Sequence, residues 1–511
     1  MVLNTARPVE RPSHLLTRRL FLCGLGIVYL IAFASLGEQV VGLAGQHGIA
    51  PVTEMLERVT AHAGARRYAV APTLFWIDAS DRALRTACWA GSVAALLLIL
   101  DVAPPLVLPL LWALYLSLQV SCDVFLSYQW DILLLETGFI AIFLAPLHLR
   151  PHTGGLARAP VLRWLFRGPG AETTPSRAVL WALRWLLFRL MLLSGLVKWL
   201  SGDPAWRQLT ALEFHYETQP LPTWIAWYAH QLPGWAQRLS TLIMFVIEIA
   251  LPFFVFGPRR ARLTACAAFV AFQIVILATG NYGFFNLLTI VLCLTLLDDG
   301  VWPQRWCDRY AARRLPDRPR RWLPALTAPV TCVLVLLSLP PALGRLGFAP
   351  SWPETMRTAL AWGQRFRLAN SYGLFTVMTK RRAEIGVQGS MDGRTWRNYE
   401  FRWKPGDARA APRFVEPHQP RLDWQMWFAA LGDFDRQFWF QRFLRRLLEG
   451  SPDVLALLRQ NPFPDAPPRY VRALIADYRF TNRATKDHGR WWQIGPERPY
   501  SPVLSRAGAG R

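Results

Sequence analysis

Charged side chains, and lysine above all, are scarce in this chain. Only 18% of its 511 residues are charged while 52% are hydrophobic, and the mean hydropathy is +0.18. These values exclude an ordinary soluble globular protein. Nearly all of the 57 basic residues are arginine, and the lysines are Lys198, Lys380, Lys404 and Lys486. Such a preference for arginine is typical of a GC-rich genome and predicts a bacterial source.

Cysteine is sparse as well and unevenly placed. All seven cysteines precede residue 345, and no two of them form a CxxC motif. We therefore expect no internal disulfide in the remainder of the chain and no thiol–disulfide exchange by this protein.

Motifs that would mark a common catalytic or cofactor site are missing from the sequence. There is no GxSxG, Walker A, HExxH or GxGxxG pattern. His215 has no second ligand at helical spacing, so we expect no metal site. The sequence thus predicts no cofactor and favours a protein without catalytic activity.

Long hydrophobic runs are abundant. Nine of them approach the ~20 residues that cross a hydrocarbon core, and many of the 24 tryptophans flank them, as in an interfacial aromatic belt. The expected spans are 18–36, 84–103, 105–122, 130–147, 181–200, 239–257, 262–278, 283–298 and 325–343. Membrane lipids are therefore an expected partner.

Arginine residues mark one side of the predicted membrane segment. The expected loops 149–178, 259–262 and 301–322 are rich in arginine, whereas the loops 37–83 and 201–238 hold far fewer basic residues for their length. By the positive-inside rule the first group faces the cytoplasm. This placement explains the net charge of +23 without a nucleic-acid partner, and no nucleic acid is expected to bind.

The last third of the chain has the pattern of a soluble domain. Residues 383–404 alternate polar and apolar side chains around a turn at 391–393, which predicts a β-hairpin. Helices are expected near 434–449 and 452–459, and a further strand at 469–480.

Together these patterns predict a polytopic α-helical membrane protein with a soluble α+β domain at its C-terminal end. Residues 1–344 would hold about eight or nine spans, with extracytoplasmic loops near 37–83 and 201–238. Residues 345–511 would form an extracytoplasmic domain rich in β-strand. The expected location is the bacterial inner membrane, or the endoplasmic reticulum in a eukaryote.

Several polar side chains fall within or at the ends of the expected spans. They are Asp131, Glu136, Glu248, Asn281 and Asn286. Ionisable groups inside a membrane are costly, so each carboxylate is a candidate functional group or the partner of another buried group. For Asp131, a helix cap at the interface is an equal alternative.

A second group of polar and aromatic residues follows the span at 181–200. It comprises Lys198, Asp203, Trp206, His215, Tyr216, Glu217 and Gln219. A desolvated lysine can lose its proton and act as a base, with His215 as a relay and Glu217 or Asp203 to orient the histidine. The alternative is a lysine that reaches the interface and pairs with Asp203.

The segment 412–432, expected to be a non-periodic loop, concentrates charged and aromatic residues. Its candidates are His418, Arg421, Asp423, Trp424 and Trp427. Tryptophan and arginine are the usual anchors of protein interfaces, so these residues are expected to form an exposed client-binding face. Alternatively, Arg421 and Asp423 only pin the loop.

Four strings resemble signatures of the lipase maturation factor family in order and spacing. They are YQWDILLLETGFIAIFLAP (128–146), LEFHYETQPLP (212–222), NYGFFNLLTIVLCLTLLDD (281–299) and PHQPRLDWQMWFAALG (417–432). The resemblance implies a polytopic membrane protein that helps exported lipases or other hydrolases reach an active state through an extracytoplasmic C-terminal domain. Its members are best known in the endoplasmic reticulum.

The segment LLSGLVKWLSGDPAW (192–206) is similar, more faintly, to part of the vitamin K-dependent carboxylase family. In that family a lysine at the end of the equivalent span is the catalytic base. The resemblance implies an alternative function, an intramembrane enzyme in which Lys198 acts on a lipid-like or quinone-like cofactor or substrate. Only Lys198 and the nearby Asp203 and Trp206 match.

Overall fold

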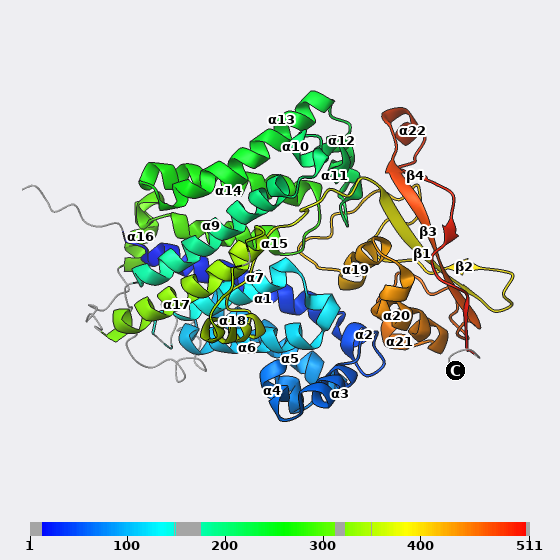
Figure 1. The fold of residues 1–511 in the computed structure, drawn as a ribbon, viewed down its shortest axis with the longest axis horizontal. Coiled ribbons are helices and arrows are strands. Elements are labelled where there is room, and N and C mark those ends of the chain that lie inside the picture. Colours follow the sequence, from blue (N-terminus) through cyan, green and yellow to red (C-terminus); the bar gives the residue numbers. More distant parts are fainter. Residues whose placement is uncertain (1–12, 148, 150–174, 312–321, 349, 507–511) are drawn as a thin grey trace, which may run out of the picture.

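The computed structural model describes residues 13–147, 149, 175–311, 322–348 and 350–506. Helices form a bundle at one end of the molecule, and a small antiparallel sheet with its own helices lies at the other end (Figure 1). The expected loops 149–178 and 301–322 lie partly outside the described residues, as does the chain before residue 13.

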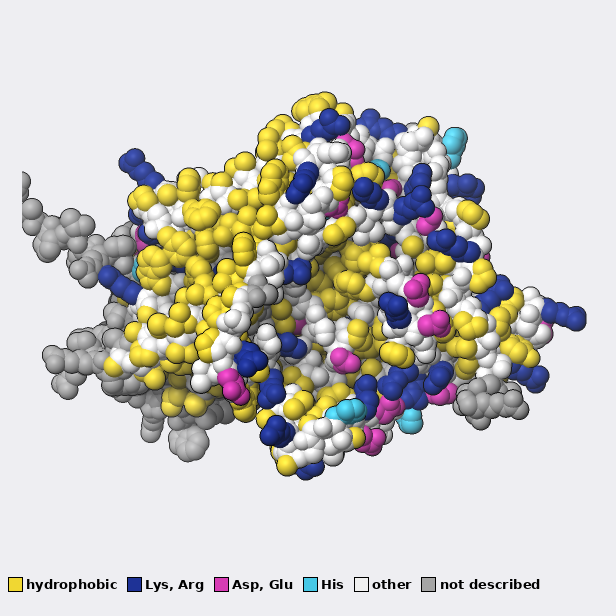
Figure 2. Space-filling model, in the orientation of Figure 1, with side chains coloured by type: hydrophobic (Ala, Val, Ile, Leu, Met, Phe, Trp, Pro, Cys, Tyr) yellow, Lys and Arg dark blue, Asp and Glu magenta, His cyan; other side chains and the backbone are white. Residues whose placement is uncertain are grey.

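Seven helices within the described residues are long and apolar enough to cross a membrane. They are α1 (Leu15–Gly37), α5 (Asp81–Ile99), α6 (Pro104–Ser121), α9 (Arg177–Leu200), α13 (Gly234–Phe245) with its continuations η5 (Val246–Ala250) and η6 (Leu251–Phe256), α14 (Arg259–Thr279) and α17 (Trp322–Arg345). Each coincides with a predicted run, which confirms a polytopic membrane protein. Figure 2 shows hydrophobic side chains spread over the bundle and charged side chains gathered over the C-terminal region.

The other two predicted runs fold as shorter helices inside the bundle. α7 (Gln129–Ile142) is almost wholly buried, and α15 (Phe285–Cys293) continues into the 3₁₀ turn η7 (Leu294–Leu296). The 14 residues of α7 rise only ~21 Å, less than a hydrocarbon core of ~30 Å. These helices tolerate polar residues because other helices cover them in place of lipid: α7 packs on α1, α6 and α9, and α15 packs on α1, α9 and α14.

Short helices cover the end of the bundle that meets the C-terminal region. They fill the predicted loops 37–83 and 201–238 and are α2 (Val40–Ala44), α3 (Val52–Ala63), α4 (Arg67–Val70), α10 (Pro204–Arg207), α11 (Leu212–Thr218) and α12 (Trp224–His230). At the opposite end lies α16 (Gln304–Ala311) (Figure 1).

The C-terminal region combines helices with an antiparallel sheet, as predicted. The strands are β1 (Arg382–Ser390), β2 (Arg397–Asn398), β3 (Tyr470–Phe480), β4 (Trp492–Ile494), β5 (Arg498–Pro499) and β6 (Leu504–Ser505), and the helices are α18 (Glu354–Arg365), α19 (Arg421–Ala430), α20 (Phe438–Glu449), α21 (Pro452–Leu455) and α22 (Arg483–Asp487). β1 and β3 pair along the whole of β1, with Arg382 opposite Tyr478 and Ser390 opposite Tyr470. The strand order is β2-β1-β3-β4, and β5 and β6 also pair with β3.

The predicted hairpin at 383–404 is only partly present. Its first half is β1, but its second half pairs for two residues only, as β2. Beyond β2, Arg402 donates hydrogen bonds to the carbonyls of Ala456 and Leu458, at 2.6 and 3.2 Å, and the chain leaves the sheet.

The prediction of a loop throughout 412–432 is wrong, because the segment contains the helix α19. Nearly all α19 residues are buried, including the charged Arg421 and Asp423. A helix covered on every side has no polar face, so its sequence lacks the 3.6-residue period by which an amphipathic helix is found.

Bundle and C-terminal region share one hydrophobic core. Leu25 in α1, Tyr115 in α6, Phe443 in α20 and Val471 in β3 belong to one continuous cluster of buried side chains. In addition, α21 packs directly on α2. The C-terminal region therefore packs closely against the bundle. The expected domain boundary at residue 344 stays a prediction.

Candidate functional site at the junction

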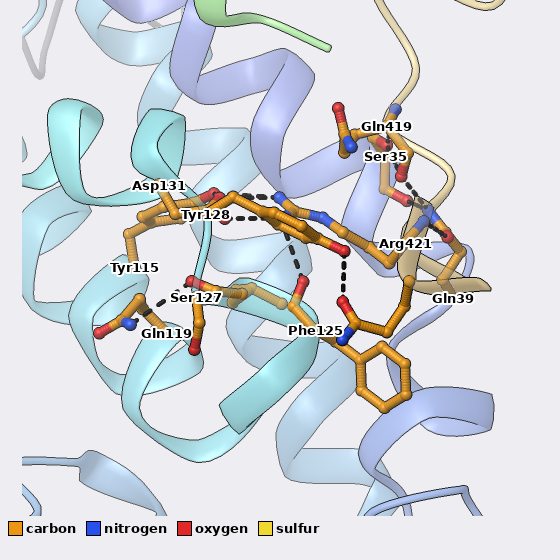
Figure 3. A network of polar contacts seen from close by, with 12 residues as sticks. Ser35, Gln39, Tyr115, Gln119, Phe125, Ser127, Tyr128, Asp131, Gln419 and Arg421 are labelled. Carbon is orange, nitrogen blue, oxygen red and sulfur yellow. Dashed lines mark hydrogen bonds and ion pairs between the residues drawn. The ribbon is translucent and has the colours of Figure 1, made fainter. Parts of the chain in front are cut away.

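A buried ion pair joins the C-terminal region to the centre of the bundle (Figure 3). Arg421 in α19 donates to both carboxylate oxygens of Asp131 in α7, from Nη1 at 2.6 Å and from Nη2 at 2.8 Å. The Tyr115 hydroxyl donates to the same carboxylate at 2.6 Å. Asp131 is fully buried and Arg421 is 1% exposed. Asp131 thus has an internal partner, which agrees with one of the two alternatives that the sequence left open and not with the other, a helix cap at the interface.

The backbone just before α19 is fixed to the end of α1. The Arg421 amide donates to Gln39 Oε1 at 2.9 Å, and Gln39 Nε2 donates to the Gln419 carbonyl at 2.9 Å. Ser35 Oγ accepts from the Gln419 amide at 2.8 Å, as Figure 3 shows. Because every partner is buried, these bonds fix the position of α19 relative to the first helix of the bundle.

Trp424 and Trp427 face the bundle, not the surface. They are 3% and 8% exposed, so the prediction that they form an exposed face is wrong. Trp424 Nε1 donates to the Asn281 carbonyl at 3.1 Å, and Trp427 Nε1 donates to the Thr218 carbonyl at 2.8 Å. In this conformation, burial leaves both tryptophans without access to a partner protein. A role of these residues in client binding therefore stays an untested prediction.

Asp423 is likewise buried, and His418 is partly buried. His418 Nδ1 lies 3.1 Å from Ser35 Oγ, and burial lowers the pKa of the ring, which keeps it neutral. Asp423 Oδ1 accepts from the amides of Trp403 and Lys404 at 2.8 and 2.9 Å. Burial raises the pKa of the Asp423 carboxyl. These contacts agree with the alternative in which Asp423 only holds a loop in place. The loop that it holds is the one at 403–404, not its own segment 412–432.

Asn281 ties the bundle to the segment before α19. Its side-chain amide donates to the carbonyls of Arg413 and Leu221 at 2.8 and 3.0 Å, and its Oδ1 accepts from the Val415 amide at 2.8 Å. Asn286 is not part of this contact; it donates to Gln273 Oε1 at 2.9 Å within the bundle.

Glu136 is the centre of a second buried junction. Its carboxylate pairs with Arg189 of α9 and accepts from the Asn370 amide at 3.1 Å and the Tyr372 hydroxyl at 2.7 Å. Glu136 is 2% exposed and Arg189 is 3% exposed. The sequence prediction of an internal partner for Glu136 is consistent with this contact, but Arg189 was missed. Its position inside the expected span 181–200 was the signal that could have revealed it.

Lys198 pairs with Glu248 rather than with Asp203. Lys198 Nζ lies 2.8 and 2.7 Å from the two Glu248 oxygens, and both side chains are buried. Asp203 caps α10 through the Ala205 amide at 2.9 Å, so the predicted pairing with Lys198 is wrong. Glu248 lies in the π-helical turn η5 (Val246–Ala250), which packs on α9. Trp206 lies beside the pair, with Nζ 5.4 Å from its ring centre.

The predicted proton relay is not assembled in this structure. His215 Nε2 lies 3.2 Å from the Tyr282 hydroxyl, which donates to Gln219 Oε1 at 2.8 Å. Burial and the nearby Lys198 lower the pKa of His215 to about 4, so the ring is neutral at physiological pH. Glu217 accepts from the Phe480 amide at 3.0 Å and thereby holds the end of β3 instead of orienting His215.

Tyr216 and Trp206 are buried in different places: Tyr216 packs with Phe480 at the end of β3, whereas Trp206 Nε1 donates to the Phe375 carbonyl at 3.0 Å. The carbonyls of Glu217 and Pro220 accept from Arg382 of β1 at 2.8 and 2.7 Å. The part of the outer-loop cluster at 216–220 thus supports the sheet, whereas Asp203 and Trp206 hold other segments.

Glu416 provides a pH-dependent test of the junction. Burial raises the pKa of its carboxyl from 4.5 to about 8, although the Tyr282 amide donates to it and opposes this shift. A raised folded-state pKa means that the folded protein binds the proton more tightly than the unfolded chain, so the free energy of unfolding falls as pH rises from 4.5 towards 8. We expect Glu416→Gln to remove this fall, with a higher melting temperature than the parent at alkaline pH and little difference at acidic pH.

The measurement is thermal unfolding in detergent across that pH range. Glu497→Gln, at an exposed carboxylate of the same region, is the matched control and should keep the slope of the parent. Parallel stability curves for the parent and Glu416→Gln would show that another group titrates.

Fold and junction together define a class of protein: a polytopic membrane protein whose extramembrane α+β domain is locked to its helices by buried ion pairs. The chain matches the model of the lipase maturation factor transmembrane domain over residues 16–304 and that of the lipase maturation factor C-terminal domain over residues 368–502. It belongs to the lipase maturation factor family.

Individual relatives match almost the whole chain. Lipase maturation factor 2 of Gallus gallus is 35% identical over 98% of this chain and 82% of its own length. The Homo sapiens protein of that name is 37% identical over 96% and 83%, and lipase maturation factor 1 of Bos taurus is 34% identical over 97% and 91%. These relatives are vertebrate proteins and do not bear out the predicted bacterial source. No solved structure matches the chain.

Proposed function

We propose that this protein is a membrane-anchored maturation factor for secreted lipase-like proteins. The observation that supports this function most directly is the identity of 34–37% to proteins named lipase maturation factors, which extends over both the bundle and the C-terminal domain. The client is an exported lipase or another exported hydrolase.

The C-terminal domain is proposed to face the extracytoplasmic side, where such a client would be met. Arginines gather at the opposite end of the bundle, where Arg259 and Arg262 lie 2.9 and 3.6 Å from Asp298. The positive-inside rule assigns that end to the cytoplasm. The membrane is then the endoplasmic reticulum, or the inner membrane if the source is bacterial.

We infer that the junction residues act by position rather than by touching the client. Arg421, Trp424 and Trp427 are buried, so they are unavailable as anchors but hold the domain at one height above the bilayer. A domain fixed in this way presents the same outer surface to each newly exported chain.

The test of this function is the output of active lipase from cells that lack the protein. We expect the specific activity of secreted lipase to fall several-fold while lipase mRNA is unchanged, because a client that fails to mature is retained and degraded. The intact chain supplied from a plasmid should restore activity. Unchanged specific activity of every exported hydrolase would overturn the proposal.

A further inference from the structure

The half of the bundle nearest the C-terminal domain contains a cavity of about 460 Å³. Its walls come from α9, α13 with η5, α14 and α15, and α11 lies at the end nearest the domain. Most of the lining is apolar, with Leu190, Ile247 and Phe272 among its residues. Cavities of ~300–1,000 Å³ with apolar walls and a few convergent polar groups are typical of small-molecule sites.

The polar groups of this cavity include Lys198, Glu248 and His215. An ammonium group has three N–H donors. Two of those of Lys198 serve the Glu248 oxygens. Among the described residues, Nζ also contacts Met244 Sδ at 3.9 Å, a weak acceptor, and the Trp206 ring, whose centre is 5.4 Å away. One strong donor is therefore left for an oxygen atom of a bound molecule.

The charge of the cavity determines what such a molecule can carry. Lys198 and Glu248 neutralise each other, and His215 is neutral because it is buried. A charged head group would find no counterion here and would have to shed its water. An uncharged oxygen acceptor meets neither penalty.

The cavity can be reached from the lipid. Ile243 on α13 and Val275 on α14 line it and are 50% and 57% exposed on the surface that a membrane would cover. α14 packs against η6 and much less against α13, so the two helices diverge towards the C-terminal domain. Figure 2 shows hydrophobic side chains over this part of the bundle. A molecule dissolved in the bilayer can therefore enter sideways.

We propose that this cavity binds a neutral lipid, with its apolar chain between α13 and α14 and an uncharged carbonyl oxygen on the Lys198 ammonium. An acylglycerol fits this description, since its ester carbonyl accepts a hydrogen bond and it has no charge. The proposal goes beyond client maturation and does not depend on it.

The experiment uses the full chain in phosphatidylcholine nanodiscs and a diacylglycerol with a diazirine on one acyl chain. After irradiation, we expect saturable labelling of the cavity-lining residues of α13 and α14, located by mass spectrometry of peptides. Ala268→Phe fills the cavity and should lower labelling about tenfold. Ala267→Phe, at the neighbouring exposed alanine that does not line the cavity, should label like the parent.

A second pair of measurements tests the polar contact. Lys198→Met together with Glu248→Met removes both charges, which a buried pair tolerates better than the loss of one partner. This double variant should lose labelling by the diacylglycerol and keep labelling by a diazirine-bearing hydrocarbon, which has no carbonyl group. Equal labelling of folded Ala268→Phe and the parent, or competition by excess phosphatidylcholine as effective as that by unlabelled diacylglycerol, would overturn the proposal.

Discussion

Replacing Arg421 with methionine is expected to lower the free energy of unfolding by about 3–5 kcal/mol, because Asp131 would remain buried without its partner. Arg421 donates two short hydrogen bonds to Asp131, which lies 290 positions away in the chain. The Tyr115 hydroxyl would remain as a donor to the carboxylate but carries no compensating charge. The measurement is thermal unfolding of the purified protein in detergent, followed by tryptophan fluorescence.

Two further variants separate the loss of the ion pair from the loss of an arginine. Arg459→Met removes a side chain that is 55% exposed and 3.9 Å from Glu400, and it should change stability by no more than about 0.5–1 kcal/mol. Arg421→Met combined with Asp131→Leu removes both buried charges and should recover much of the lost stability. A single Arg421→Met variant as stable as the parent would show that the pair does not hold the junction.

Replacing Glu136 with leucine should destabilise the protein by a similar amount, about 3–5 kcal/mol, since Arg189 would be left buried and unpaired. The amide of Asn370 and the hydroxyl of Tyr372 would lose their acceptor as well. The segment that contains them should then be cut faster by a protease, and the cleavage site can be located by mass spectrometry.

Tyr372→Phe is a milder variant whose loss of stability can be compared with that of Glu136→Leu. It removes one donor of the carboxylate and leaves Arg189 in place, so the expected loss is about 1.5–3 kcal/mol, the range for a hydrogen bond to a charged group. Equal losses in Tyr372→Phe and Glu136→Leu would contradict the assignment of Arg189 as the principal partner.

The long helices could be predicted from the sequence because a bilayer imposes a length and a hydropathy on each of them. The runs at 130–147 and 283–298 were found as hydrophobic segments, but their short helical length depends on the neighbours that enclose them. Strand β3 was predicted nearly to the residue, since its face towards the core alternates with its exposed face.

Most charged members of the candidate site were predicted, although Arg189 was missed, but their pairings were not. Glu248 was singled out as an intramembrane acid and Lys198 as a candidate base, yet only the packing of η5 on α9 shows that they pair with each other. Arg421 was expected at the surface because polar residues usually lie there. No local pattern could show that Asp131, far away in the sequence, provides a buried partner.

The separation of Arg421 from Asp131 has a consequence for biosynthesis. A ribosome adds ~5–20 residues per second, so the 290 residues between them take roughly 15–60 s to synthesise. During that interval α7 is already made while the guanidinium that neutralises its carboxylate does not yet exist. The centre of the bundle is thus completed only when α19 has been made, and a nascent chain halted before residue 421 would carry an acid there without its arginine partner.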